Sequence, residues 1–219
     1  LLIYFWESCN FTNGFHYEVN LMSESQIQDL IKKKINDINF LFDQTKNIST
    51  VIFNLFSSSI INYELLEENN FDYVCKSLNN YITDNKPKNF VLINIDKIFI
   101  NNSISKCVDF RNFYSTKTLY TIDFLKDYIN HINPIVKSLK GFSKKCLVLD
   151  CDNTLWNGII GEDKIEGIQM SRDSPKGSVF YEIQNLIKIL HSKGILIALN
   201  SKNNLEDVEE YLKIVKTCF

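Results

Sequence analysis

Short apolar runs alternate with helical repeats along the chain. Apolar runs typical of buried strands occur at 1–6, 51–56, 90–95, 147–149 and 195–199. Between them, apolar residues recur at every third or fourth position, which predicts helices over 25–42, 63–81, 121–139, 178–191 and from 205 onward. Strand and helix in alternation predict an α/β fold, in which right-handed crossover helices connect parallel strands.

Local signals mark several of these helix ends. Ser25 and Gln28 have the spacing of a capping box at the start of the first helix. Pro134 lies inside the helix over 121–139 and should kink or restart it. Lys193-Gly194 predicts a left-handed stop after the helix that ends at His191.

A short polar segment at 140–143 separates two α/β regions. It predicts a domain over 1–141 and a second domain over 142–219. We expect each domain to be a parallel-sheet, three-layer α/β/α structure. Because the connecting segment is short, we expect the two domains to be docked.

Two carboxylates follow the apolar run 147–149 directly. Asp150 and Asp152 alternate as residues of an extended strand do, so their side chains can face one pocket, and Thr154 adds a hydroxyl. The contiguous apolar run predicts a strand that is buried on both faces and ends at Asp150, at the sheet edge where α/β proteins bind ligands. Paired carboxylates suit Mg²⁺. With phosphate charge neutralised, Asp150 could attack phosphorus while Asp152 transfers protons and Thr154 contacts the phosphate.

The alternative is an ordinary solvated turn, because Asp, Asn and Thr are common turn residues. A turn of that kind does not require a buried strand before the acids. Nor does it require Leu155 and Trp156 immediately after them. We therefore favour the phosphoryl-transfer interpretation.

These residues resemble a known motif. Asp-x-Asp-x-Thr-Leu after a hydrophobic strand resembles motif I of the haloacid dehalogenase (HAD) superfamily of phosphotransferases. The sequence at 152–163, 166–168 and 200–204 is similar to the FkbH-like group of that superfamily, subfamily IIIC. The resemblance covers 143–219, and the stretch 110–123 is similar to the one that precedes the phosphatase-like domain in that family.

The resemblance implies a HAD-like, Rossmannoid C-terminal domain and an SGNH-hydrolase-like N-terminal region. It implies that Asp150 and Asp152 hold Mg²⁺ and that Ser201, as the motif II hydroxyl, binds phosphate with Lys202 and Asn203. Three of the seven glycines, at 158, 161 and 167, would belong to a flap over the phosphate site. The alternative for this glycine-rich segment is a bare surface hairpin.

The chain also departs from the family pattern. Many relatives carry Cys where this chain has Asn200, and Cys151, placed between the two acids, is expected to serve core packing. No Gly-Asp-Ser block is present in the N-terminal region. A motif III Lys and a motif IV acid would lie beyond Phe219, so we expect the C-terminal domain to be truncated and the fragment alone to be inactive. Because the chain begins at Leu1 and not at Met, we expect the N-terminal domain to be truncated as well.

The function that the resemblance implies is dephosphorylation of 1,3-bisphosphoglycerate and loading of the glyceryl unit onto a phosphopantetheine-bearing acyl carrier protein, for polyketide or related biosynthesis. A plain Mg²⁺-dependent phosphatase acting on another small phosphometabolite, for example in surface glycan assembly, is the second hypothesis. A non-catalytic binding module is the third.

The net charge and the cysteine spacing limit which kinds of partner and site we expect. The formal charge of −2 gives no general affinity for nucleic acid or anionic membranes, and no run of 18 apolar residues is present. The six cysteines form no Cys-x-x-Cys pair, which argues against a zinc site or a disulfide scaffold and predicts reduced thiols in a cytoplasmic protein. Asp109 and Arg111 are expected to form a structural ion pair; the alternative is that Arg111 clamps a carboxylate or a phosphate.

Overall fold

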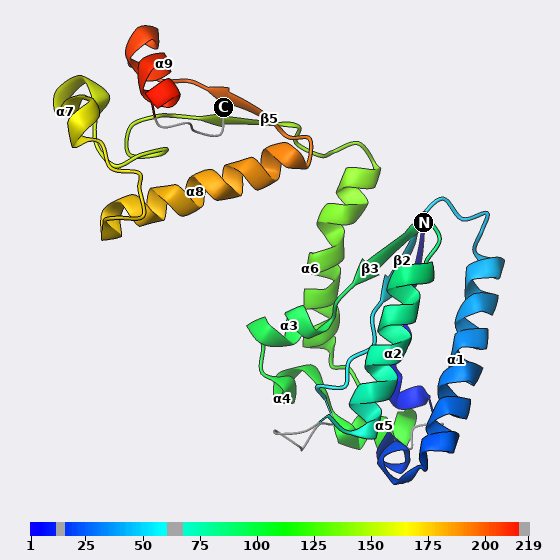
Figure 1. Cartoon of the computed structure of the whole chain (residues 1–219). Coiled ribbons are helices and arrows are strands. Elements are labelled where there is room, and N and C mark those ends of the chain that lie inside the picture. The colour runs from blue at the N-terminus through cyan, green and yellow to red at the C-terminus, as the bar shows by residue number, and fades with distance from the viewer. Residues whose placement is uncertain (12–15, 61–67, 215–219) are drawn as a thin grey trace. The chain divides into compact units, whose positions relative to one another are not determined.

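The computed structural model describes residues 1–11, 16–60 and 68–214, apart from the side chains at 16, 165, 166, 213 and 214. The chain divides into two compact units, Leu1–Pro134 and Ile135–Phe219 (Figure 1). The division lies inside one helix, α6 (Ile122–Leu139), whereas the sequence predicts a boundary at 141/142. Each unit is described by itself below.

The first unit contains a parallel sheet with the strand order β1-β2-β3. In register, Ile3 pairs with Ile52, and Ile52 pairs with Val91. The strands are β1 (Leu2–Tyr4), β2 (Val51–Asn54) and β3 (Phe90–Ile93). The α-helices are α1 (Glu24–Gln44), α2 (Asn70–Asn85), α3 (Asp96–Asn101), α4 (Ile104–Cys107), α5 (Phe110–Thr116) and α6 (Ile122–Leu139), and the 3-10 helices are η1 (Ser8–Asn10) and η2 (His16–Leu21).

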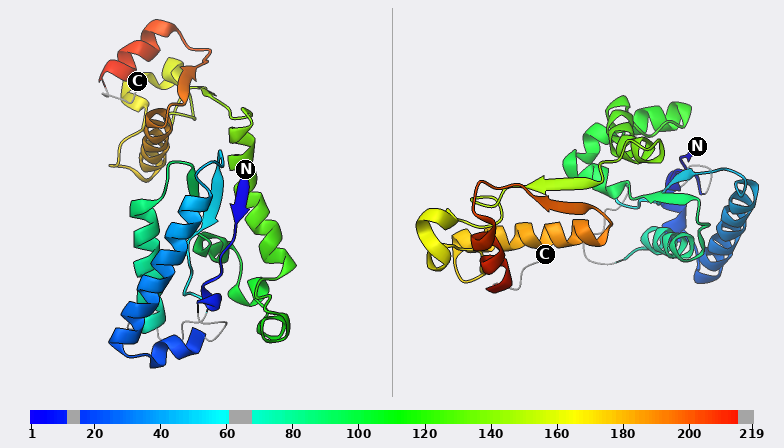
Figure 2. Two further views of the ribbon diagram at one scale, coloured as in Figure 1. Left: turned by 90° about the vertical axis from the view of Figure 1, so that its right-hand side faces the viewer. Right: turned by 90° about the horizontal axis from the view of Figure 1, so that it is seen from above.

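Helices lie on both faces of this sheet. Both views show α1 and α2 on one side of the strands and α6 on the other (Figures 1 and 2). The central strand β2 is buried along its whole length, because it has a strand on either side and helices above and below. Aromatic side chains fill much of the core; for example, the Phe11 and Phe56 ring centroids lie 4.7 Å apart with edge-to-face geometry.

Helix α1 has a capping box, but not at the predicted residues. The Ser23 hydroxyl accepts a hydrogen bond from the Gln26 amide, and the Gln26 side chain accepts one from the Ser23 amide at 2.8 Å. The prediction of Ser25 and Gln28 was wrong by two positions, because the helix starts at Glu24 and leaves Ser25 inside its first turn. The predicted start of the second helix falls within 61–67, outside the described residues; from Asn70 the helix is present and extends to Asn85.

Helix α6 runs through Pro134 as one helix, so of the two expected outcomes, a kink or a restart, the restart was wrong. Before it, Asp109 caps α5 by accepting hydrogen bonds from two backbone amides. The Arg111 guanidinium lies 3.4 Å from the Asp109 carboxylate, and this pairing lowers the pKa of Asp109. The predicted structural ion pair is therefore confirmed.

The second unit contains β4 (Cys146–Leu149) and β5 (Leu196–Leu199), which pair in parallel. Helix α8 connects them. The helices after β4 are α7 (Ile160–Gly167), α8 (Pro175–Ser192) and α9 (Leu205–Ile214). Gly194 ends α8 with a φ of +86°, which confirms the predicted left-handed stop.

Only one face of the β4–β5 pair meets the described core. Leu149, Ile197 and Leu199 pack against the buried cluster of this unit. On the opposite face, Val148 is 58% exposed and Leu196 is 66% exposed. The expectation of burial on both faces was therefore wrong for the described residues, because their helices contribute core side chains to one face of these strands.

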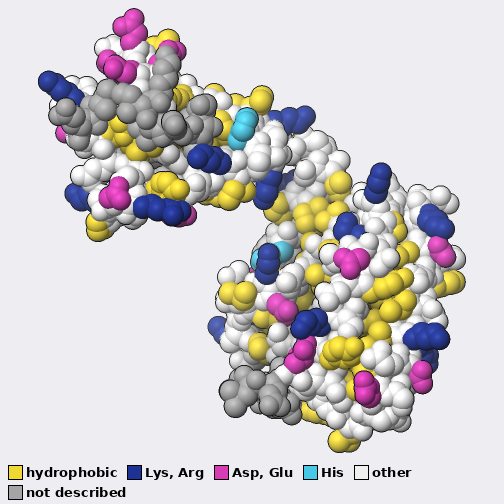
Figure 3. Space-filling model, in the orientation of Figure 1, with side chains coloured by type: hydrophobic (Ala, Val, Ile, Leu, Met, Phe, Trp, Pro, Cys, Tyr) yellow, Lys and Arg dark blue, Asp and Glu magenta, His cyan; other side chains and the backbone are white. Residues whose placement is uncertain are grey.

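The prediction of an α/β fold with parallel sheets is confirmed. The finer assignment, an SGNH-like unit and a HAD-like unit, stays a prediction. Acidic and basic side chains are interspersed on the face that Figure 3 shows. Among the helices that the structure describes, none combines the length and apolar character that crossing a membrane requires.

Candidate functional site

The candidate site forms where β4 and β5 end side by side. Leu149 pairs with Leu199, and the amide of Asn200 donates a hydrogen bond to the Leu149 carbonyl at 2.8 Å. The loop that begins at Asp150 and the loop that begins at Asn200 therefore leave the same edge of the sheet. This is the carboxyl edge, where parallel α/β sheets bind their ligands.

The chain turns sharply after Asp150. The amides of Thr154 and Leu155 both donate to the Cys151 carbonyl, at 3.2 and 2.9 Å. Asn153 sits in the left-handed region with a φ of 51°, and its side-chain oxygen accepts from the amide of Gly158 at 3.1 Å. Gly158 itself has a φ of +117°, which favours glycine. These contacts hold the two carboxylates on a closed, hydrogen-bonded turn.

The two carboxylates have different surroundings. Asp150 is exposed, and its Oδ1 accepts from the Cys151 amide at 2.8 Å, while its Oδ2 has no hydrogen-bond partner among the described residues. Asp152 is half-buried and accepts three hydrogen bonds, from Trp156, Ile160 and Asn203. Asp150 therefore has an oxygen available to a ligand, and Asp152 is fixed in orientation.

The other predicted site residues lie on the same edge, with different contacts. Thr154 is half-buried at the turn after β4, whereas Ser201, Lys202 and Asn203 follow β5. The Ser201 hydroxyl accepts from the Asn203 amide at 3.3 Å, and Lys202 is exposed. The Asn203 side chain, predicted to bind phosphate, donates to Asp152 at 2.9 Å. The structure thus joins Asp152 to the loop of Ser201 directly.

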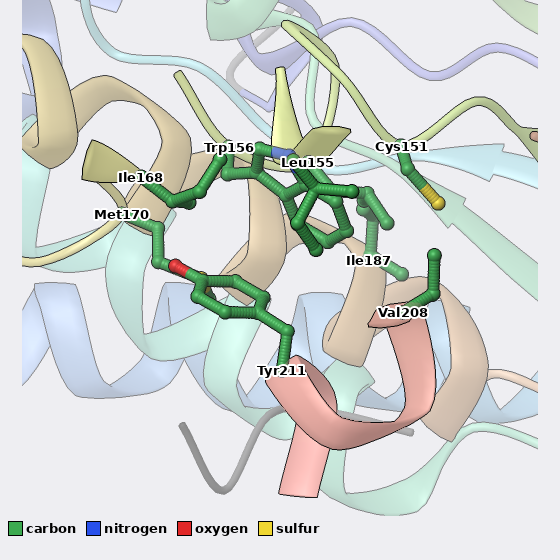
Figure 4. Close-up of a cluster of buried hydrophobic side chains, with 9 residues drawn as sticks. Cys151, Leu155, Trp156, Ile168, Met170, Ile187, Val208 and Tyr211 are labelled. Atoms are coloured by element: carbon green, nitrogen blue, oxygen red, sulfur yellow. The ribbon is translucent and has the colours of Figure 1, made fainter. Parts of the chain in front are cut away.

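Cys151 points into the core. It is fully buried in a cluster with Leu155, Trp156, Val208 and others (Figure 4). Burial raises the pKa of the Cys151 thiol, and the neighbouring aspartates raise it further, against the effect of a hydrogen bond with the Ser201 side chain. The thiol is therefore protonated at neutral pH, in agreement with the predicted packing role.

The glycine-rich segment after the acids is more than a bare hairpin. Asn157 and Gln169 exchange two backbone hydrogen bonds, of 2.9 and 3.0 Å, so the two ends of the segment lie side by side. Between them lies α7, which the sequence did not predict and which is interrupted at Lys164, where φ is 54°. The Asp163 carboxylate accepts from the Ile159 amide at 2.8 Å and so holds the start of this helix.

The side chains at the carboxyl edge of β4 and β5 fit a Mg²⁺ ion that keeps most of its water ligands. Among the described residues, no three His, Cys, Asp or Glu side chains gather closely enough to form a metal site. Mg²⁺ commonly binds through one or two carboxylates together with waters and substrate phosphate, so it does not need a cage of protein ligands. Asp150, with one carboxylate oxygen available, is the side chain that fits this role better; Asp152 already accepts three hydrogen bonds.

The first unit has a polar junction of its own. The Asn54 side chain donates to the Trp6 carbonyl and accepts from the Trp6 amide, both at 2.7 Å. Ser57 donates to the Asp96 carboxylate, and Ser8 donates to the Ser57 carbonyl. These contacts tie together the segments after β1, β2 and β3.

No protein-family model matches the chain, and no curated protein matches its sequence. Among solved structures, the N-terminal part of the protein BF1531 from Bacteroides fragilis, which contains a phosphatase domain and is complexed with Mg, matches with a TM-score of 0.73 and 26% sequence identity. The chain shares the fold of this phosphatase-containing protein. The match covers 96% of this chain and 56% of the other, so the chain spans little more than half of that structure.

Trp156 is the site residue that sequence reasoning missed. The sequence places Trp156 after the acids, but no contact with them is predicted from it. In the structure it is fully buried, at 0% exposure, and its indole nitrogen donates a hydrogen bond to Asp152. The signal available in the sequence was the spacing, because Trp156 follows Asp152 by four positions within a tight turn.

Proposed function

We propose that this chain carries the nucleophile and the acid–base group of a Mg²⁺-dependent phosphatase that acts on a phosphorylated small molecule. The observation that carries the proposal is the arrangement at the end of β4, where an exposed Asp150 lies two residues from Asp152 and beside the loop of Ser201. The similarity in fold to a magnesium-complexed protein with a phosphatase domain supports it.

In this mechanism, the free oxygen of Asp150 attacks phosphorus while the bond from phosphorus to the leaving oxygen breaks. Asp152 gives its proton to that leaving oxygen. Water then attacks the aspartyl-phosphate, Asp152 takes the water's proton, and inorganic phosphate leaves with Asp150 regenerated. In this proposal, Thr154, Ser201 and Lys202 contact phosphoryl oxygens. Because the free oxygen of Asp150 is the nucleophile, Mg²⁺ would be held by the other Asp150 oxygen, which has a second lone pair beside its hydrogen bond from the Cys151 amide, together with water and substrate phosphate. When bound, it would neutralise charge on the phosphate.

The test is a substitution of the proposed nucleophile, Asp150. In the full-length protein with Mg²⁺ and para-nitrophenyl phosphate, Asp150→Asn should lower phosphate release by at least about 10³-fold, because an amide oxygen is a poor nucleophile. The control is Asp173→Asn, an exposed acid outside the site, which should leave the rate unchanged. Normal phosphate release by Asp150→Asn would contradict the proposal.

The finer function is also a proposal. Loading of a glyceryl unit from 1,3-bisphosphoglycerate onto an acyl carrier protein, in the cytoplasm, is supported by the resemblance of 143–219 to the FkbH-like group. Thioester formation on a carrier protein, followed by mass spectrometry, separates it from plain phosphatase action. If the protein releases phosphate but forms no thioester, plain phosphatase action is favoured over glyceryl loading.

A further inference from the structure

The carboxylate of Asp152 receives hydrogen bonds from three separate parts of the second unit. Its Oδ1 accepts from the Trp156 indole nitrogen at 3.0 Å and from the Ile160 amide at 3.2 Å. Its Oδ2 accepts from the Asn203 side-chain nitrogen at 2.9 Å. Together, the three donors hold both oxygens of this carboxylate.

Two of the donors are rigid. Trp156 is fully buried, and its ring meets that of Tyr211 edge to face, with centroids 5.0 Å apart (Figure 4). Ile160 is 5% exposed and begins α7. Because neither can shift without disturbing the core, Oδ1 of Asp152 is held in one place.

The third donor, Asn203, belongs to the loop that follows β5. Asn203 lies between β5 and α9, and its backbone amide donates to the Ser201 hydroxyl at 3.3 Å. Its side chain therefore bridges from the Ser201 loop to the acid that follows β4. The neighbouring Asn204 behaves differently, since its side chain donates to Asp207 in the first turn of α9 at 3.3 Å.

We propose that Asn203 and Trp156 are positioning residues that orient the Asp152 carboxylate, and that the Asn203 side chain does not bind substrate phosphate. The proposal rests on the phosphatase function above. Asn203 and Trp156 hold opposite oxygens of one carboxylate, which fixes its rotation as well as its position. Proton transfer depends on such alignment, and partners that orient a reacting group commonly contribute about 10–100-fold in rate.

Kinetics distinguish positioning from phosphate binding. With para-nitrophenyl phosphate and Mg²⁺, Asn203→Ala and Asn203→Asp in the full-length protein should lower kcat by about 10–100-fold with little change in KM. Asn203→His keeps an N–H donor and should recover part of kcat, whereas Asn204→Ala, the matched control, should leave both constants unchanged. A raised KM with an unchanged kcat for Asn203→Ala would overturn the proposal in favour of phosphate binding.

A second measurement does not depend on activity. The chain has two tryptophans, so ¹⁵N–¹H spectra should contain two indole N–H signals from it, and Trp156→Phe identifies one of them. Asn203→Ala should shift the Trp156 signal, because both residues hold the same carboxylate, and Asp152→Asn should shift it further. Asn204→Ala should not.

An unmoved Trp156 signal in Asn203→Ala would overturn the positioning role. If the wild-type protein releases no phosphate, the proposed phosphatase function fails, and the indole signal still decides whether Asn203 and Trp156 hold Asp152 together. The two failures are therefore distinguishable.

Discussion

At the scale of single residues, the two acids of the site differ because their hydrogen-bond donors differ. Asp150 is exposed and accepts from the neighbouring Cys151 amide, whereas Asp152 is held by Trp156 and Asn203. In the function that we propose, this difference suits Asp150 to nucleophilic attack and Asp152 to oriented proton transfer. The proposed division of roles comes from the surroundings of each carboxylate.

Another acid, Glu7, lies buried in the first unit. It is 9% exposed, its Oε2 accepts from Asn10 at 3.1 Å, and its Oε1 has no hydrogen-bond partner among the described residues. Burial raises the pKa of Glu7 from 4.5 to about 7. Burial, with a smaller contribution from the nearby Glu7 charge, raises the pKa of Cys9 to about 12, so the Cys9 thiol stays protonated.

Glu7 makes the stability of the protein pH-dependent in a defined window. The folded state binds the Glu7 proton more tightly than the unfolded state does, so the free energy of unfolding should fall as pH rises from about 4.5 to about 7 and then level off. The loss attributable to Glu7 is about 2–3 kcal/mol. Glu7→Gln resembles the protonated acid, so this variant should lack that part of the slope and be more stable than wild type at pH 8.

Urea unfolding at several pH values measures this difference. Glu182→Gln, which changes an exposed carboxylate on α8, is the control and should follow the wild-type curve. Parallel curves for wild type and Glu7→Gln between pH 5 and 8 would show that Glu7 ionises normally in the folded protein.

At the scale of elements, helix ends depend on which polar residue stands outside the first turn. Two serines near the start of α1 fit the capping pattern, and the structure assigns the cap to Ser23. Ser25 lies inside the helix, with its hydroxyl 3.1 Å from that of Ser23. The choice was open from sequence, because both serines are followed three positions later by a glutamine.

The capping assignment gives a paired prediction. Ser23→Ala should lower the free energy of unfolding by about 1 kcal/mol, because the Gln26 amide loses its acceptor. Ser25→Ala is the matched control and should change it by less than about 0.3 kcal/mol, since alanine is favoured within a helix. Urea unfolding monitored by circular dichroism measures both, and a larger loss for Ser25→Ala would reverse the assignment.

At the scale of the whole molecule, each compact unit has a hydrophobic core of its own. The cluster around Leu155 and Trp156 is built from residues of the second unit. In the first unit, β2 and the aromatic residues near Phe53 and Phe56 form the centre. Separate cores of this kind allow each unit to lose stability without the other.

A core substitution in one unit tests this independence. Leu155→Ala removes a side chain that is 1% exposed and should cost about 3 kcal/mol. Amide hydrogen exchange, read by mass spectrometry, should then show lower protection over 146–212 and unchanged protection over 24–130. Val148→Thr, at a position 58% exposed, is the control and should change stability by less than about 0.5 kcal/mol. Lower protection in both regions after Leu155→Ala would show that the units unfold together.

The strands with the long helices between them, the end of β4 just before Asp150 and the stop at Gly194 follow from the sequence alone, because apolar periodicity and turn chemistry act over a few residues. The short helices α3, α4, α5 and α7 do not. The role of Asn203 does not, because the acid it holds lies 51 positions away in the chain. The exposed face of β4, the cap at Ser23 and the buried Glu7 were likewise decided by tertiary structure. Each depends on which distant groups, or which of two equivalent neighbours, the folded chain brings into contact.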